Sequence, residues 1–264
     1  MALKRTNRQG ISSRSTLAKH RVLGLAYLPM LLALDYLSIA PRAATAFVLG
    51  AVPFAWLIVR LAKGVDVRTV GSGNVGATNA SRAFVGRGAR IAVFLLVYLL
   101  DAGKGLFGTW LGWGADSDVA SSLPGAVICA ACAILGHVFT PFLRGRGGKG
   151  VATALGVVLV LAPQAVLLAF AVFAGVAGTP RLVALGSILA ALAFGGIQLT
   201  LMGSQALEAR NLSLTIFSVV VPLLIIWRHR SNIVRLVKGT ELAVTTPEST
   251  DEETPNTESD AGNS

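Results

Sequence analysis

Long, nearly continuous runs of apolar residues are the feature that most constrains what this chain can fold into. The runs cover residues 22–40, 43–62, 91–114, 123–142, 151–176, 182–202 and 212–227. About 20 apolar residues in a helix are enough to cross the hydrocarbon core of a bilayer. The runs do not alternate between apolar and polar residues, as the strands of a membrane β-barrel do. The pattern therefore predicts an all-α polytopic membrane protein.

The composition supports this class, because 53% of the residues are hydrophobic and only 14% are charged, against about 25% charged residues in a soluble domain. The charges are unevenly placed. Residues 245–264 hold six acidic residues and no Lys or Arg, so 23 basic residues stand against seven acidic ones in residues 1–244. The bases gather in a few loops, which predicts cytoplasmic loops that attract anionic head groups or substrates. They do not form one basic face, so we predict no nucleic-acid partner.

The basic loops also constrain the number of membrane crossings. Residues 144–149 and 228–235 are both strongly basic and should lie on the same, cytoplasmic side, but three spans between them would separate them. A break at Pro163 divides the run 151–176 into two short segments and restores the parity. Such segments are tolerated where they are buried or line a cavity. The break also brings Ser187 to the cytoplasmic side.

The two ends of the chain differ in composition from its centre. Residues 1–42 form a basic extension, and for its apolar run we predict an extra transmembrane helix rather than a cleaved signal peptide. Residues 43–243 form the membrane domain, without an internal linker. Residues 244–264 are acidic and rich in Ser, Thr and Pro, a composition typical of disordered segments.

The most polar passage between two apolar runs is Gly71-Ser-Gly-Asn-Val-Gly-Ala-Thr-Asn-Ala-Ser-Arg82. Its glycines leave backbone N–H groups accessible, and Ser72, Asn74 and Arg82 offer a hydroxyl, an amide and a guanidinium, as anion sites do. The glycine spacing matches G-x-G-x-x-G, but the flanking membrane spans exclude the strand–helix unit that a dinucleotide site requires. The alternative is a tight interhelical loop in which Arg82 only sets topology. We favour an anion site.

A second polar segment, Arg144-Gly-Arg-Gly-Gly-Lys149-Gly-Val-Ala-Thr153, follows another apolar run. It places glycines and Lys149 at the start of a helix, where backbone N–H groups and a lysine can cradle a phosphate, although it lacks the P-loop spacing. The third segment contains His229 and Asn232, whose spacing of three residues predicts a shared helical face. Either segment could instead be a basic loop that sets topology or binds lipid head groups.

The remaining polar residues in apolar runs have structural explanations. Asp101 and Lys104 can pair one turn apart, and His137 lies near a predicted helix end. Cys129 and Cys132 form a lone C-x-x-C, whereas a zinc site needs about four ligands. We therefore predict no metal site and no disulfide framework, and the sequence suggests no covalent nucleophile.

Together, the segments GSGNVGATNASR, GGKGVAT and HRSNIVRLVKGTE resemble the motifs of the acyl-phosphate:glycerol-3-phosphate acyltransferases, the PlsY family of bacterial inner membranes. The motifs occur in the family's order, and the resemblance covers about residues 43–241. It implies a seven-helix bundle, here with the extra N-terminal helix, whose active site and C-terminus face the cytoplasm. It also implies transfer of a fatty acyl group from acyl phosphate to the 1-hydroxyl of glycerol 3-phosphate, giving lysophosphatidic acid, without a metal, another cofactor or a covalent acyl-enzyme.

The resemblance assigns residue roles motif by motif. The implied catalytic residues are Ser72, Asn74, Arg82, His229 and Asn232. The implied phosphate-binding residues are Gly147, Gly148, Lys149, Gly150 and Ser187. Glu241 is implied to be structural. The family's Ser-Leu-x-Ser segment is Ala184-Leu-Gly-Ser187 here, so only its second hydroxyl is present.

Because acyl phosphate is already activated, we expect catalysis by positioning and electrostatic preorganisation. The general base is either His229 or a phosphate oxygen of the substrate, and the acyl chain is expected in a groove between helices, open to the bilayer. The expected partners are the two substrates and membrane lipid, with the acyl-phosphate-forming enzyme as a candidate. The alternative function is a transporter of a small organic phosphate, which should place polar groups through the middle of the membrane.

Overall fold

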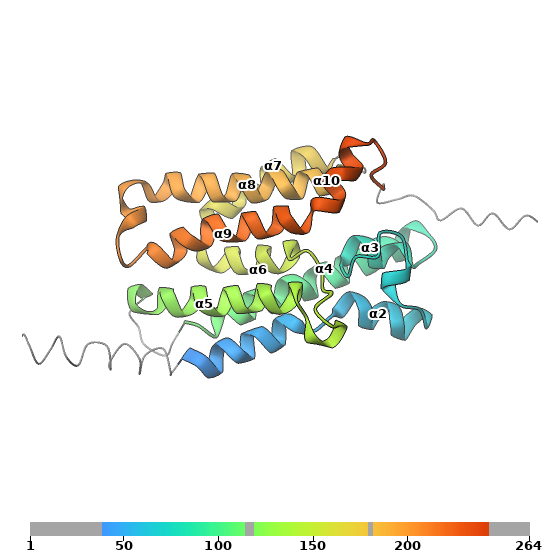
Figure 1. Cartoon of the computed structure of the whole chain (residues 1–264), viewed down its shortest axis with the longest axis horizontal. Helices are drawn as coiled ribbons and strands as arrows, with labels where there is room; N and C mark the ends of the chain where they lie inside the picture. Colours follow the sequence, from blue (N-terminus) through green and yellow to red (C-terminus); the bar gives the residue numbers. More distant parts are fainter. Residues whose placement is uncertain (1–38, 114–118, 179–181, 243–264) are drawn as a thin grey trace, which may run out of the picture.

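The computed structural model describes residues 39–113, 119–178 and 182–242, and every regular element in these ranges is helical (Figure 1). This confirms the predicted all-α class for the described part of the chain. The predicted helix in residues 22–40 lies outside the described residues except for its last two positions. The acidic segment 244–264 lies entirely outside them.

The helices follow one another with short connections. In chain order they are the helix of residues 39–51, α2 (Phe54–Lys63), α3 (Ala77–Arg82), α4 (Arg87–Trp110), α5 (Val119–Val138), α6 (Val151–Leu161), α7 (Pro163–Ala177), α8 (Val183–Met202), α9 (Leu212–Arg228) and α10 (Arg230–Val237). Three single-turn 3-10 helices are η1 (Val67–Thr69), η2 (Pro141–Leu143) and η3 (Gly203–Leu207).

Four segments of the described chain are long and apolar enough to cross a membrane: Ile39–Lys63, Arg87–Trp110, Leu123–Leu143 and Val183–Leu207. α9 and α10, which meet at an angle of 57°, would make a fifth if taken together. α6 and α7 are apolar but shorter than the ~20 residues of a straight span.

The first of these segments is broken in its middle, unlike the continuous run that we predicted for residues 43–62. Its first helix ends at Ala51, and α2 begins after Pro53, which has no N–H to donate. Two carbonyl oxygens at the break accept hydrogen bonds from distant side chains, Lys104 on α4 and Thr140 just after α5. Thr140 Oγ1 donates to the Ala51 oxygen at 2.6 Å, and Lys104 Nζ donates to the Val52 oxygen at 2.8 Å. A break inside a membrane is stable when its backbone groups are satisfied in this way.

The predicted break at Pro163 is confirmed. α6 ends at Leu161, Ala162 leaves the helical region with φ −151° and ψ 61°, and α7 begins at Pro163. Proline suits the first position of a helix, because its missing N–H would have had no intrahelical partner. The chain then returns through α7, so that Ser187 lines the same pocket as Lys149.

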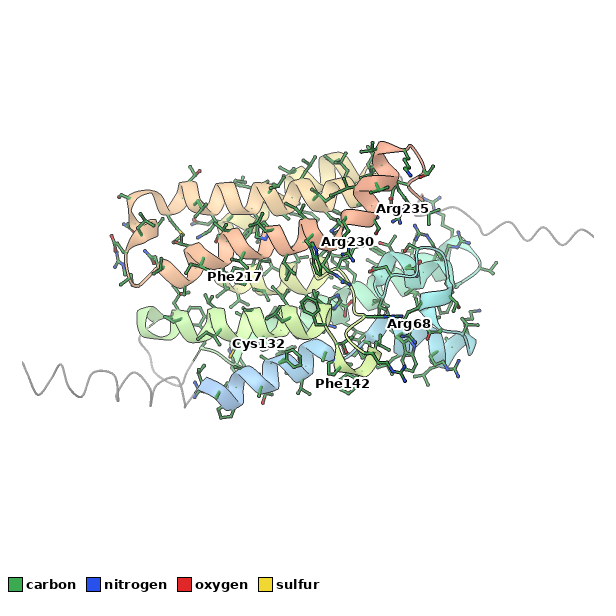
Figure 2. The ribbon with its side chains drawn as sticks, viewed as in Figure 1. Arg68, Cys132, Phe142, Phe217, Arg230 and Arg235 are labelled. Atoms are coloured by element: carbon green, nitrogen blue, oxygen red, sulfur yellow. The ribbon has the colours of Figure 1, made fainter. Side chains whose placement is uncertain are left out.

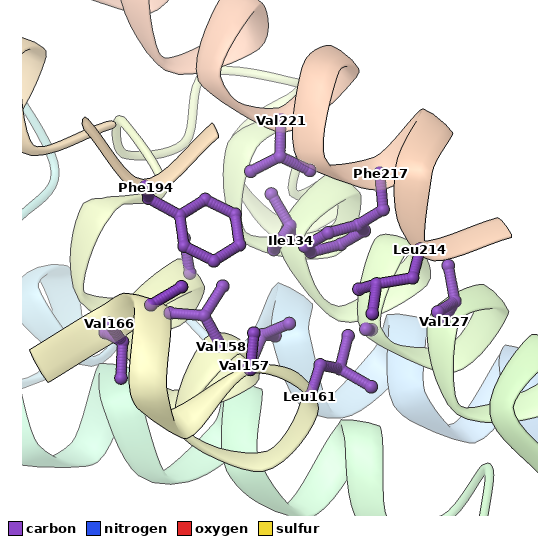
Figure 3. Close-up of a cluster of buried hydrophobic side chains, with 14 of the residues drawn as sticks. Val127, Ile134, Val157, Val158, Leu161, Val166, Phe194, Leu214, Phe217 and Val221 are labelled. Carbon is purple, nitrogen blue, oxygen red and sulfur yellow. The ribbon is translucent and has the colours of Figure 1, made fainter. Parts of the chain in front are cut away.

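Buried apolar side chains from α5, α6, α7, α8 and α9 form the main core (Figure 3). Ile134, Val157, Phe194 and Phe217 are all buried there. α4 lies close against α6, because a Cβ atom at Gly156 would overlap the backbone of α4. Small residues allow such close approach between membrane helices.

Charged residues gather at one end of the bundle. In Figure 1, α3 and α10 lie at this end with the loop between α5 and α6, whereas the connection between α8 and α9 lies at the opposite end. Figure 2 shows Arg68, Arg230 and Arg235 at the same end, while Cys132 and Phe217 lie along the apolar helices. We call this end of the bundle the polar end.

Candidate active site

A single pocket at the polar end brings the three sequence motifs together. We call it the polar pocket; it encloses about 890 Å³ of empty space, counting the part open to solvent. The predicted site residues that line it are Ser72, Asn74, Arg82, Lys149, Gly150, Ser187, His229, Asn232 and Glu241. Segments separated by more than 150 residues in the sequence therefore contribute to one site.

Asn79 belongs to the first motif but was not among the predicted site residues. It organises the first wall of the polar pocket. It is 1% exposed, and its Oδ1 accepts hydrogen bonds from the Ser72 N–H at 2.9 Å, from Ser72 Oγ at 3.2 Å and from Arg82 Nη1 at 3.3 Å. Its Nδ2 donates to the backbone oxygens of Val67 and Val70, both at 2.9 Å. Asn79 therefore fixes the loop and holds Ser72 and Arg82 beside each other.

Arg82 supplies the positive charge of this wall. Its Nη2 donates to the backbone oxygen of Leu242 at 3.4 Å, which ties α3 to the segment after α10. Burial lowers the pKa of the guanidinium below its ordinary value, and the nearby Glu241 carboxylate opposes that shift. A guanidinium stays charged in proteins, so Arg82 presents a permanent cation to the pocket.

The N–H groups of Gly147 and Gly148, which we predicted to bind phosphate, form hydrogen bonds within the protein. Their N–H groups donate to the backbone oxygens of Val138 at 3.1 Å and His137 at 3.2 Å, at the end of α5. A Cβ atom at Gly148 would overlap the His137 ring and the backbone oxygen of Val75. The two glycines therefore let the loop pack against α5 and the first motif, and Gly150 is the predicted glycine that lines the polar pocket.

Arg228, at the end of α9, holds the same loop from the other side. Its Nη2 donates to the backbone oxygens of Gly147 at 2.9 Å and Gly148 at 3.1 Å. From the sequence, Arg228 was interpreted only as one of the basic residues that flank a membrane span. Its contacts instead link the second motif to the third.

A chain of hydrogen bonds joins Lys149 to the end of the third motif. Lys149 Nζ donates to Asn232 Oδ1, and Asn232 Nδ2 donates to Glu241 Oε1 at 2.6 Å. The second oxygen of Glu241 accepts from Arg235 Nε at 3.0 Å. Glu241 thereby orients Asn232, which in turn fixes the position of the Lys149 ammonium.

Burial lowers the pKa of Lys149 to about 8. The Glu241 carboxylate opposes the shift, and three neighbouring guanidinium groups add to it. Lys149 is thus charged near neutral pH and close to losing its proton under mildly basic conditions. A phosphate ligand would favour the charged form.

His229 lies at the corner between α9 and α10, where the helix axis bends by 57°. We predicted that His229 and Asn232 share one helical face, but His229 lies outside the regular helix that contains Asn232. Both side chains are nevertheless buried and line the polar pocket. His229 Nδ1 is 2.8 Å from the backbone oxygen of Ile225. That carbonyl requires a proton on Nδ1, which leaves Nε2 of a neutral ring as the available acceptor.

A buried ion cluster lies beneath the polar pocket. Asp101 Oδ1 is 2.8 Å from Lys104 Nζ and 3.6 Å from His137 Nδ1, and all three side chains are buried. The predicted pairing of Asp101 with Lys104 is confirmed. Because Lys104 also donates to the broken first segment and His137 touches Gly148, the cluster connects α4, α5 and the glycine loop.

An apolar pocket adjoins the polar pocket. It encloses about 580 Å³, again counting open space, and its walls come from α4, α6, α7, α8 and α9. The two pockets share Tyr98, Val151, Phe173 and Ser187. Ser187 Oγ donates to the backbone oxygen of Val183 at 2.9 Å, so its lone pairs remain for a ligand at the junction.

On the solvent side, a basic hollow of about 1000 Å³ leads to the same residues. It shares Ser72, Asn74 and Lys149 with the polar pocket. Its other charged lining residues are Arg68, Arg146, Arg228, Arg230 and Arg235. A hollow of one charge concentrates anions at its base. Within the described ranges, His, Cys, Asp and Glu side chains nowhere gather in a group of three or more that could hold a metal ion.

Comparison with known proteins gives a consistent result. The family model for glycerol-3-phosphate acyltransferase matches residues 42–239. The glycerol-3-phosphate acyltransferase of Myxococcus xanthus is 41% identical over 195 residues, which is 74% of this chain and 94% of that protein. The corresponding protein of Geobacter sulfurreducens is 43% identical over 198 residues, covering 75% and 93% of the two chains.

Two solved structures are also similar. They are crystal structures of PlsY (YgiH), an integral membrane glycerol 3-phosphate acyltransferase, in its glycerol 3-phosphate form and its lysophosphatidic acid form. The first superposes with a TM-score of 0.66 at 36% identity and the second with 0.64 at 33% identity, each covering 78% of this chain and 95% of the other. From the family match, these relatives and the shared fold, we conclude that this chain is a membrane acyltransferase that belongs to the glycerol-3-phosphate acyltransferase family.

Proposed function

We propose that this chain transfers a fatty acyl group from acyl phosphate to the 1-hydroxyl of glycerol 3-phosphate. The products are lysophosphatidic acid and inorganic phosphate. The observation that carries the proposal is the junction of two unlike pockets at Ser187, one lined by Arg82 and Lys149 and the other by apolar side chains. A phosphate-bearing head and an acyl chain would meet at this junction.

In the proposed reaction, the glycerol hydroxyl oxygen attacks the acyl carbonyl carbon, and the bond to the phosphate oxygen breaks. Arg82 and Lys149 neutralise the phosphate charges, while Ser72, Asn74 and Asn232 orient the hydroxyl and the carbonyl. The hydroxyl proton passes to His229 Nε2 or to a phosphate oxygen. Transfer is direct, so neither a metal nor a covalent acyl-enzyme takes part.

The test uses purified full-length protein in lipid nanodiscs, supplied with acyl phosphate and glycerol 3-phosphate. We expect lysophosphatidic acid and inorganic phosphate in equal amounts. In parallel reactions, acyl-CoA or acylated carrier protein replaces acyl phosphate, and we expect no product. If acyl phosphate gives no product, or if the same protein in liposomes instead moves glycerol 3-phosphate across the bilayer, the enzymatic proposal is wrong.

For the membrane topology, we propose seven crossings, formed by residues 39–63 and by α4, α5, α6, α7, α8 and α9. The extra helix precedes them in the apolar run 22–40, whose last two residues belong to the first crossing. The polar end faces the cytoplasm of a bacterial inner membrane, because the basic loops lie there. Residues 1–42 are then an extension, residues 43–243 the catalytic domain and residues 244–264 an acidic tail. Topology reporters fused at Met1 and Ser264 should both report a cytoplasmic position. A periplasmic signal at Met1 would remove the extra crossing.

As a partner we propose the enzyme that forms acyl phosphate, because the basic hollow could accept an acidic surface next to the active site. Cross-linking at Arg146, in intact bacterial cells, would identify it. Recovery of lipid alone from this position would contradict the proposal.

A further inference from the structure

We infer that Phe194, together with Val158, Val166 and Val221, forms the floor of the apolar pocket and limits the length of the acyl chain that is transferred efficiently. The inference rests on the proposed function, because it places the donor's acyl chain in this pocket. It adds a determinant of substrate length, which neither the motifs nor the family assignment provides.

The depth of the pocket follows from the residues that line α8. Ser187 lies at the junction with the polar pocket, Ala190 and Ala191 follow one turn further, and Phe194 is the last lining residue on this helix. Seven residues of α-helix rise by about 10 Å. The lining residues of α6 run in parallel from Val151 to Val158 over the same number of positions. A pocket of this depth holds only part of a long fatty acyl chain.

The floor is backed by the close-packed core of the protein. Phe194, Val158, Val166 and Val221 are between 4% and 6% exposed and belong to the main core cluster. Figure 3 shows the Phe194 ring beside Val221 and Val158, with Phe217 further into the cluster. Membrane-protein cores, like other close-packed interiors, do not open without loss of contacts. A chain that reaches Phe194 therefore cannot continue in the same direction.

The wall nearer the surface is different, because Phe170 on α7 is 50% exposed while it lines the same pocket. Methylenes beyond the floor must leave along this side. The pocket gives no further burial to that part of the chain. A methylene inside the pocket packs against protein, whereas a methylene beyond the floor lies against lipid, which is equally apolar, so the two differ in their packing contacts. The preference should therefore rise with chain length and level off where the floor is reached.

The first experiment compares two Phe→Ala variants with the same chemistry and different positions. Phe194→Ala removes the floor, whereas Phe217→Ala removes a ring that is 3% exposed in the same cluster but is not among the residues lining either pocket. kcat/KM is measured for acyl phosphates of increasing length. We expect Phe194→Ala to move the chain length at which kcat/KM levels off by two or more methylenes towards longer chains. Phe217→Ala should keep the wild-type profile.

The second experiment introduces a larger side chain into the pocket. It therefore does not require the protein to tolerate the cavity that a Phe→Ala change creates. Ala190 lines the pocket, and Ala193 is half-buried against the core on the same helix without lining it. Ala190→Leu should shift the preferred acyl chain towards shorter lengths by two to three methylenes, at unchanged KM for glycerol 3-phosphate. Ala193→Leu is the matched control and should leave the profile unchanged.

Binding of straight-chain alkyl phosphates to each variant in nanodiscs provides a readout that needs no turnover. Their Kd values should show the same length dependence and the same shifts. If the wild type shows this dependence but makes no lysophosphatidic acid, the length limit stands and the proposed reaction fails. If Phe194→Ala and Phe217→Ala give the same Kd profile, or if Ala190→Leu leaves the profile unchanged, the length limit is overturned.

Discussion

The polar and apolar pockets meet at Ser187, yet they are built in different ways. The polar pocket takes most of its polar side chains from the short helix α3 and the loop before it, a glycine loop and a helix corner. Hydrogen bonds hold Arg82, Lys149 and Asn232 in place there. The apolar pocket takes its side chains from apolar helices that also form the main core.

This difference determines how each pocket should respond to mutation. Removing one partner of a buried hydrogen bond leaves the other partner unsatisfied, which costs about 1–3 kcal/mol, and more when a charge is involved. Removing part of an apolar wall changes many weak contacts by small amounts. We therefore expect large, position-specific losses in the polar pocket and graded changes of chain-length preference in the apolar one.

The largest loss is expected for Lys149→Met, which keeps most of the aliphatic stem and removes the ammonium. Loss of a charge-assisted contact to phosphate should lower kcat/KM by roughly 10- to 150-fold, mainly through the KM for glycerol 3-phosphate. Initial-rate kinetics at varied glycerol 3-phosphate measure this effect. Lys238→Met removes an exposed cation just after α10 and serves as the control; equal losses in both variants would indicate a general charge effect.

A smaller loss is expected for Asn79→Ala, because Asn79 positions Ser72 and Arg82 and carries no charge itself. The variant leaves the carbonyl groups of Val67 and Val70 without their side-chain donor, so kcat should fall by about tenfold, with a loss of about 1–3 kcal/mol in stability. Kinetics and thermal unfolding in the same nanodiscs test both effects. Retention of wild-type kcat at reduced stability would show that Asn79 is only structural.

The last prediction concerns pH. Because the pKa of Lys149 is about 8, its ammonium is charged below this value and neutral above it. The KM for glycerol 3-phosphate should therefore be flat below pH 8 and rise above it, by at most about tenfold per pH unit. KM measured from pH 6.5 to 9.5 tests this. Lys149→Arg keeps its charge throughout, so a rise that persists in this variant would assign the titration to another group.

Sequence patterns predicted much of the site, because the chemistry of phosphate recognition restricts the residue types that can provide it. Ser72, Arg82, Lys149 and Asn232 were identifiable from polar residues in otherwise apolar surroundings, and the structure places them in one pocket. Gly148 was predicted as a phosphate-binding residue, and nothing in the sequence indicated its packing contacts. Its role in packing against His137 depends on how α5 meets the loop, and no local pattern contains that information.

The fold shows the same division between local and long-range information. The break at Pro163 was predictable, because two basic loops could lie on the same side of the membrane only if the chain crossed once more between them. The break at Pro53 was missed, because no comparable charge pattern indicates it. At that break, Lys104 on α4 and Thr140 just after α5 donate hydrogen bonds to the carbonyl oxygens, and both are far away in the sequence.

The sequence by itself determined the helical membrane class, the polar motifs and the prediction that these motifs lie on one side of the membrane. The length of an apolar run and the charge of a loop are properties of short stretches of the chain, so both can be read without the tertiary structure. The tertiary structure decided which groups hold the motifs in place and where the apolar pocket ends. Val158, Phe194 and Val221 look like any other residues of an apolar helix, and only the packing of α6, α8 and α9 makes them the floor of a pocket. Such packing joins residues far apart in the chain, and apolar side chains carry no directional signal that could reveal their partners in advance.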